Sequence, residues 1–271
     1  MKNILIFNDI SGLGNCSMTA NISIFNKLGH YCMPLVTATY SCQTGFRNFT
    51  CQKNANLTKC VAEITSHRMP ESVYVGFCAD TNLLCEITRE VASLPAETLK
   101  FVDPIMGDNG ALYSVFDDSY VSAMKTLVRG AYCISPNLTE ACLLFGIDYA
   151  ELISHQDEPT FLAHCGKVFE NFCDTVGVHN AVITGIQCGK LIGNIVLQKG
   201  SVQYVTNERV PVNYSGTGDA FSSVLLGELL CGATLLSATQ IAANFVGKAA
   251  SLTQCSDSRF GTEFSRVLNL L

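Results

Sequence analysis

Short apolar runs alternate along this chain with segments whose apolar residues recur at helical spacing. The runs predict strands at residues 2–8, 30–38, 73–77, 100–102, 131–134 and 181–184. The spacing predicts helices at residues 18–28, 57–66, 83–93 and 120–128, each between two of these runs. Such alternation is typical of an α/β fold in which a doubly wound, mostly parallel sheet carries helices on both faces.

The last third of the chain begins with a predicted hairpin. Its strands, 191–197 and 201–205, flank Lys199-Gly200, and helices are predicted at 220–231 and 237–252. We find no linker, repeat or low-complexity tract, so residues 1–271 are predicted to form a single domain.

Composition narrows the possible partners. The net charge is −6 and no Lys/Arg cluster occurs, which argues against nucleic-acid binding. The most apolar stretch, 224–236, contains Glu228 and two glycines, so no membrane span is expected. The 14 cysteines are scattered and form no CxxC pair, and the N-terminus does not resemble a signal peptide. We therefore expect reduced thiols and a cytoplasmic protein.

One turn carries the strongest chemical signal. Gly216, Thr217 and Gly218 precede Asp219, and an apolar helical run follows. Glycines allow close backbone approach, and a helix N-terminus offers free N–H groups to a phosphate. Asp219 would then be placed to accept a proton from an attacking hydroxyl group. The alternative is a tight turn in which Asp219 caps the helix.

Three further polar clusters follow predicted strands, where ligands of parallel sheets gather. Asn8 to Gly14 contains two glycines and Asp9, but Ser17 stands at the third position of a dinucleotide fingerprint, which argues against a nicotinamide site. Asp103 to Gly110 carries Asp103 and Asp108, which could position Mg²⁺ or simply form a turn.

The remaining cluster, Ser135 to Glu140, allows two interpretations. Asn137 and Glu140 have the spacing of a helix capping box, and the same spacing puts both side chains on one helical face beside a hydrated Mg²⁺. Thr184 adds a hydroxyl group at the end of another strand. Together with the 216–219 turn, these positions predict a nucleotide-phosphate and metal site.

The order of these motifs resembles that of the ribokinase superfamily, over nearly the whole chain. Gly216 to Asp219 and the Asn137/Glu140 pair are characteristic of the superfamily, and Asp103 to Asp108 reads Asp-Pro-Ile-Met-Gly-Asp, as in its vitamin kinases. The segments 9–17 and 41–46 are most similar to pyridoxal/pyridoxamine kinases.

The resemblance implies a role for each residue. Asp219 would be the catalytic base, and the amides of Gly216, Thr217 and Gly218 the anion hole. The substrate ring would meet Asp9, Ser11, Thr44 and Phe77, and the nucleotide would meet Ser135, Asn137, Thr184, Tyr113 and Phe245. Mg²⁺ would be handled by Asp103, Asp108 and Glu140. ATP, a nearby monovalent cation such as K⁺ and a homodimer are also implied.

Departures from the pattern leave the substrate open. Many pyridoxal kinases carry Ser at the position of Asp9 and Tyr at the position of Phe77, and some carry Ser at the position of Gly185. An ionised Asp9 favours a ligand with an amine or a ring N–H, which fits pyridoxamine and an aminopyrimidine equally. We therefore expect phosphorylation of the 5′-hydroxymethyl group of pyridoxal, pyridoxamine or pyridoxine, with hydroxymethylpyrimidine as the alternative substrate. Sugar phosphorylation, non-catalytic B6 binding and Cys-based chemistry are weaker alternatives.

Overall fold

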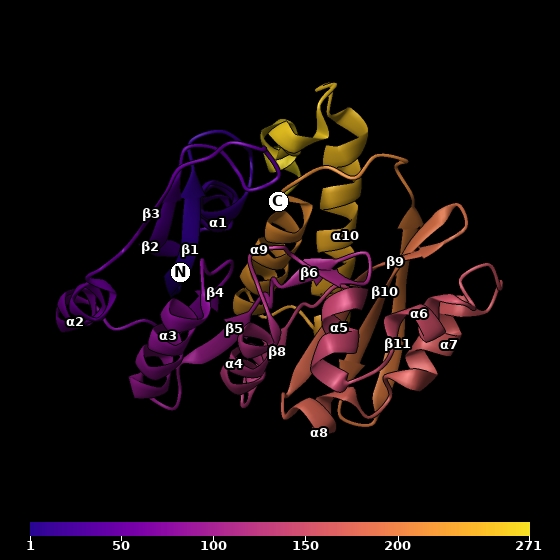
Figure 1. Ribbon diagram of the computed structural model, residues 1–271, viewed down its shortest axis with the longest axis horizontal. Coiled ribbons are helices and arrows are strands. Elements are labelled where there is room, and N and C mark those ends of the chain that lie inside the picture. Colours follow the sequence, from indigo (N-terminus) through magenta and orange to yellow (C-terminus); the bar gives the residue numbers. More distant parts are fainter.

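A nine-stranded sheet forms the centre of the molecule, and the computed structural model describes residues 1–271. Its strands run in the order β11-β10-β9-β8-β5-β4-β1-β2-β3, from one side of Figure 1 to the other. They are β1 (Asn3–Ser11), β2 (Tyr31–Tyr40), β3 (Cys51–Lys53), β4 (Ser72–Val75), β5 (Leu99–Val102), β8 (Cys133–Ile134), β9 (Asn180–Cys188), β10 (Leu191–Gln198) and β11 (Ser201–Glu208). All neighbouring pairs from β2 to β9 are parallel, whereas β3 pairs antiparallel with β2, and β10 with both β9 and β11. A separate small hairpin joins β6 (Gly107–Asp108) to β7 (Ala111–Leu112).

Helices cover both faces of the sheet. One face packs against α2 (Leu57–His67), α3 (Thr81–Ser93), α4 (Asp118–Val128), α5 (Leu138–Phe145), α6 (Tyr149–Ile153), α7 (Phe161–Val168) and α8 (Phe172–Val176). The other packs against α1 (Ser17–Lys27), α9 (Thr217–Leu230), α10 (Leu235–Leu252) and the 3₁₀ segment Phe264–Leu270; a shorter 3₁₀ turn spans Ser258–Phe260. No helix is both long and apolar enough to cross a membrane.

The central strands are apolar because both of their faces are buried. In β1, Leu5 and Phe7 pack on the α2–α8 side and Ile4 and Ile6 on the α1, α9 and α10 side, all without solvent exposure. A run of this kind is typical of a parallel sheet enclosed by helices. The predicted α/β fold class is therefore confirmed.

Several elements differ from the sequence prediction. Helices α6, α7 and α8 were not predicted, because segments of five to eight residues show too little periodicity. Strand β1 continues to Ser11 rather than ending at Asn8, with a register shift against β2 between Asn8 and Ile10. Strand β4 ends at Val75 rather than Phe77, and a Cβ on Gly76 would lie 2.6 Å from Asn8 Nδ2. The Asn8 side chain thus fills the space beside Gly76.

Candidate active site

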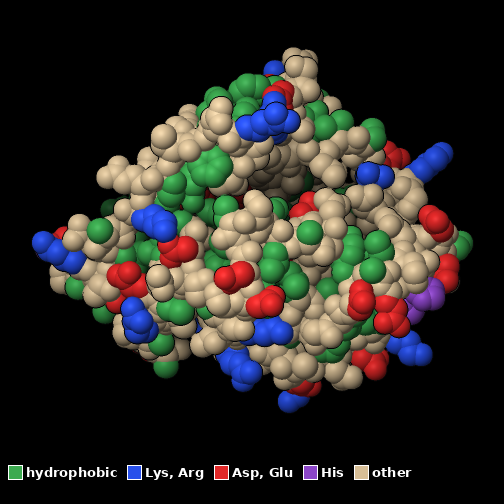
Figure 2. Space-filling view, in the orientation of Figure 1, with side chains coloured by type: hydrophobic (Ala, Val, Ile, Leu, Met, Phe, Trp, Pro, Cys, Tyr) green, Lys and Arg blue, Asp and Glu red, His purple; other side chains and the backbone are tan.

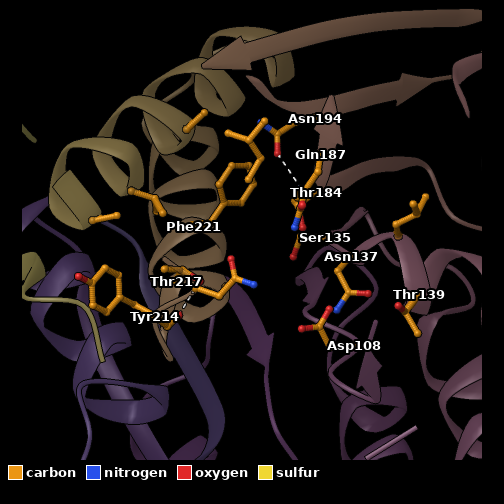
Figure 3. A pocket seen from close by; sticks show the side chains of 18 of the residues that line it. Asp108, Ser135, Asn137, Thr139, Thr184, Gln187, Asn194, Tyr214, Thr217 and Phe221 are labelled. Carbon is orange, nitrogen blue, oxygen red and sulfur yellow. Dashed lines mark hydrogen bonds between the residues drawn. The ribbon is translucent and has the colours of Figure 1, made fainter. Parts of the chain in front are cut away.

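A cavity of about 800 Å³ opens beside the carboxyl ends of the central strands. Figure 2 shows the molecule hollowed on this face. Its lining comes from the segments after β5 and β8, parts of β9 and β10, α5 and α6, the first turn of α9, one face of α10 and the segment 207–216. In Figure 3, Ser135, Asn137 and Asp108 face Thr217 and Phe221 of α9 across the cavity. Its size suits a nucleotide or another ligand of comparable size.

The turn before α9 is held in a shape that only glycine adopts easily. Gly216 has φ +77° and is the N-cap residue, and a Cβ there would overlap the carbonyl oxygen of Asn15. Gly218 differs, because a Cβ at that position would meet nothing within 4 Å. Gly216, Thr217 and Gly218 all line the cavity, and the N–H groups of a helix's first turn have no partner within the helix, as an anion site requires.

Asp219 lies in the first turn of α9 and does not cap it. The N-cap is Gly216, with no side-chain cap, so the structure does not support the simple capping interpretation of Asp219. Its carboxylate lines the cavity although it is only 7% exposed, and it takes part in no salt bridge. Asn8 Nδ2 donates to its Oδ1 at 3.3 Å. A buried carboxylate without a cationic partner is placed to accept a proton.

Burial and local hydrogen bonds act on Asp219 in opposite directions. Burial raises its pKa above the ordinary value, while the backbone N–H of Ser17 and the side chain of Asn8 stabilise the charged form. Ser17 is one of two non-glycine residues with positive φ, at 52°. Such a conformation is costly away from glycine and is concentrated at functional sites.

Asp103 is a second buried carboxylate in the cavity wall. The Tyr74 hydroxyl donates to its Oδ2 at 3.3 Å. Burial, and after it the charge of Asp219, raises the pKa of Asp103 to about 7. No Lys or Arg neutralises this group, which suits a site where a cation arrives with the ligand.

Asn137 and Glu140 form the capping box that their spacing predicts. Asn137 Oδ1 accepts from the Glu140 N–H at 2.9 Å, and Glu140 Oε2 accepts from the Asn137 N–H at 2.8 Å. Glu140 Oε1 accepts from the Met106 N–H at 3.0 Å, and Asn137 Nδ2 donates to the Gly107 carbonyl at 2.8 Å. The pair therefore fixes the Asp103 to Asp108 loop against α5, while both residues line the cavity.

Ser135, Thr184 and Asp108 complete this wall. Ser135 Oγ lies 2.8 Å from Ser222 Oγ of α9, and the Thr184 N–H donates to the Pro136 carbonyl at 2.8 Å. Asp108 is exposed and accepts from its neighbour Asn109. No group of three or more His, Cys, Asp or Glu side chains is arranged to hold a metal alone. The oxygen donors present fit Mg²⁺ shared with phosphates and water rather than a closed protein cage.

The predicted ring-binding residues lie outside this cavity. Asp9 and Ser11 are buried at the end of β1, where Ser11 Oγ donates to Asp9 Oδ2 at 3.2 Å and Asp9 Oδ1 has no partner. Burial is the main cause that raises the pKa of Asp9 to about 7, and the nearby charge of Asp219 adds to it. Phe77 packs in an aromatic cluster with Tyr40, whereas Thr44 is exposed on a loop.

Of two apolar or aromatic residues predicted to contact the nucleotide, one lies in the core and the other lines the cavity. Phe245 is 2% exposed and packs in the core, so it does not line the cavity; the α10 residues that do are Ala243, Val246, Gly247 and Ala250. The face of α10 that lines the cavity therefore lies beside Phe245, whose own ring packs in the core rather than at the nucleotide contact that the resemblance implied. Tyr113 does line the cavity and is 41% exposed.

Other functional candidates were not predicted. Asn8 contacts Asp219. Arg209 is the sole Lys or Arg that lines the cavity, whereas five lining residues carry carboxyl groups: Asp103, Asp108, Glu140, Glu208 and Asp219. Asn8 was predicted only as the first residue of the polar cluster Asn8 to Gly14, with no role of its own; its position at the end of an apolar run is the signal for one. The segment 207–214, which also lines the cavity, carries no motif that marks it.

Comparison with known proteins decides the family. The profile of the phosphomethylpyrimidine kinase family matches residues 13–263. The chain belongs to this family. It is a phosphotransferase related to pyridoxal and hydroxymethylpyrimidine kinases, and the predicted ribokinase-like fold is confirmed.

The relatives of this family member carry two kinds of name. A Bacteroides thetaiotaomicron structure described as a phosphomethylpyrimidine kinase is 28% identical, with a TM-score of 0.90 over 99% of this chain and 93% of that one. The pyridoxal kinase of Lactobacillus plantarum is 27% identical, with a TM-score of 0.87 over 100% and 96%. The hydroxymethylpyrimidine/phosphomethylpyrimidine kinase of Bacillus subtilis is 23% identical over 89% of this chain and 86% of its own.

Proposed function

We propose that this kinase transfers the γ-phosphoryl group of ATP to the 5′-hydroxymethyl group of a vitamin B6 ring. The observation that carries the proposal is the position of Asp219, a carboxylate without a cationic partner that lines the cavity beside the Gly216–Gly218 turn. Support for the ring comes from the Bacteroides relative, another of whose crystal forms contains pyridoxal (27% identity, TM-score 0.88).

Each group has a step in the proposed reaction. Asp219 accepts the proton of the substrate hydroxyl as its oxygen bonds to the γ-phosphorus, and the bond from that phosphorus to the bridging oxygen of ADP breaks. The Gly216–Gly218 amides stabilise the charge on the transferring phosphoryl oxygens. Asp103, Asp108 and Glu140 would hold Mg²⁺ directly or through water, and Mg²⁺ would neutralise phosphate charge.

The ring would bind near Asp9, on the β1 side of Asp219. The unpartnered Asp9 Oδ1 can accept from a ring N–H or an amine, and the Phe77 cluster offers an aromatic surface. Hydroxymethylpyrimidine, with its exocyclic amine, meets the same requirement. The second candidate function, a hydroxymethylpyrimidine kinase, is favoured by the family match and by the Bacillus relative.

The test is ADP formation with Mg·ATP and pyridoxal, pyridoxamine, pyridoxine, hydroxymethylpyrimidine or ribose. We expect turnover on the B6 rings, and an Asp219→Asn variant to lose roughly 10²–10⁴-fold in kcat with little change in KM. Asp118→Asn is the matched control, because Asp118 also lies in the first turn of a helix but outside the cavity. Preference for the pyrimidine would support the second candidate, and normal turnover by Asp219→Asn would refute the role of Asp219.

A further inference from the structure

The Asn8 side chain links the two halves of the proposed site. It is fully buried and uses all of its hydrogen-bonding capacity. Its Nδ2 donates to Asn21 Oδ1 at 2.8 Å and to Asp219 Oδ1 at 3.3 Å. Its Oδ1 accepts from the N–H groups of Asp9 and Phe77, each at 3.0 Å. We propose that Asn8 is a positioning residue that sets Asp219 relative to the ring-binding end of the site.

A closed circuit of hydrogen bonds supports this role. Asn21 Nδ2 donates to Ser223 Oγ at 2.8 Å, and Ser223 Oγ donates to the Asp219 carbonyl at 2.6 Å. Asp219 is thus fixed at its carboxylate by Asn8 and at its backbone through Asn21. All four residues are buried, so water offers little competition for these bonds.

The Asn8 Oδ1 atom is fixed by the backbone of Asp9 and Phe77, the two residues proposed to contact the ring. The Phe77 N–H follows directly after Gly76, where a Cβ would lie 2.6 Å from Asn8 Nδ2. Glycine therefore makes the room that Asn8 occupies between β1 and the end of β4. Because the amide group is planar and rigid, a shift of the Phe77 or Asp9 backbone moves the donor that holds Asp219.

The inference rests on the proposed role of Asp219 as the base. A positioning residue acts only through the group it positions, whereas a residue that merely stabilises the fold lowers activity whatever stands at 219. A double-mutant cycle separates the two cases, since only coupled residues give non-additive effects.

The experiment measures kcat and both KM values for Asn8→Ala, Asp219→Asn and the double variant. We expect Asn8→Ala to lower kcat roughly ten- to hundred-fold, with KM for Mg·ATP within about three-fold of wild type. In the Asp219→Asn background the same change should lower kcat less than about two-fold. An equal loss of kcat in both backgrounds, or no loss in either, would overturn the proposal.

Asn180→Ala is the matched control. Asn180 is a buried asparagine at the opposite end of its strand from the site, with bonds to the Tyr132 carbonyl and Gln198 Nε2. It should lose thermal stability comparably and keep wild-type kcat. If Asn8→Ala does not fold, Gly76→Ala, which displaces Asn8, enters the same cycle with the same expected pattern. Full activity of Asp219→Asn would refute the proposed base, whereas a normal Asn8→Ala beside an inactive Asp219→Asn would refute this inference alone.

Discussion

The carbonyl oxygen of Asn15 occupies the space that a side chain on Gly216 would need. Asn15 is itself held by the C-terminal segment, because its N–H donates to the Phe260 carbonyl at 2.9 Å. The loop after β1 and the segment around Phe260 therefore support the turn that precedes Asp219 from behind.

This contact predicts opposite outcomes at two neighbouring glycines. Gly216→Ala must both adopt a positive φ and displace Asn15, so we expect a loss of about 1–3 kcal/mol in unfolding free energy and a loss of nucleotide binding. Gly218→Ala should fold like the wild type, since its Cβ has free space, and should weaken nucleotide binding only. Thermal melts with and without ADP distinguish the pair; equal melting temperatures for both variants would contradict the explanation.

The buried Asp9 predicts a stability that falls as pH rises. Its pKa is raised from 3.8 to about 7 in the fold, so the folded state holds this proton more tightly than the unfolded state. The ionisation of Asp9 therefore lowers the free energy of unfolding increasingly from about pH 4 to about pH 7, and by a constant amount above that. Each unit of difference between the folded and unfolded pKa corresponds to about 1.4 kcal/mol. Asp9→Asn should therefore gain more stability over wild type at pH 8 than at pH 5 in urea unfolding. The same gain at both pH values would show that Asp9 is not perturbed.

Glu140→Gln tests whether the capping box also serves the metal. The Glu140 carboxylate now accepts hydrogen bonds from two backbone N–H groups. The amide nitrogen of the introduced glutamine would face one of them with a second donor, so we expect the free energy of unfolding to fall by about 1–3 kcal/mol. We also expect a higher Mg²⁺ requirement for ADP formation. Glu151→Gln, in the first turn of α6, is the control. Lower stability with an unchanged Mg²⁺ requirement would leave Glu140 a capping residue only.

The wall formed by α10 predicts which side chains limit the nucleotide. Val246 lines the cavity, so Val246→Trp should raise KM for ATP about ten-fold by filling space, which corresponds to about 1.4 kcal/mol of binding energy. Phe245→Leu should instead cost about 1 kcal/mol of stability and leave this KM unchanged. The reverse result would restore Phe245 as a nucleotide contact.

Sequence patterns predicted the fold better than they predicted the site. The alternation of apolar runs and helical spacing identified the parallel sheet because each central strand is buried on both faces. The same patterns could not show which face of α10 meets the cavity, since Phe245 and Val246 are adjacent and both apolar. They also gave no sign that Asn8 reaches Asp219, a contact across 211 positions of sequence. The homodimer, the K⁺ site and the single-domain organisation stay predictions.

The charge of the cavity wall has a consequence for what can enter it. Five carboxyl groups and one guanidinium surround the space where a triphosphate would lie. Where these carboxyl groups are ionised, a bare polyphosphate would be repelled, and a cation bound to the nucleotide would relieve that repulsion. If the proposed function holds, the wall would favour the cation complex of the nucleotide over its free form.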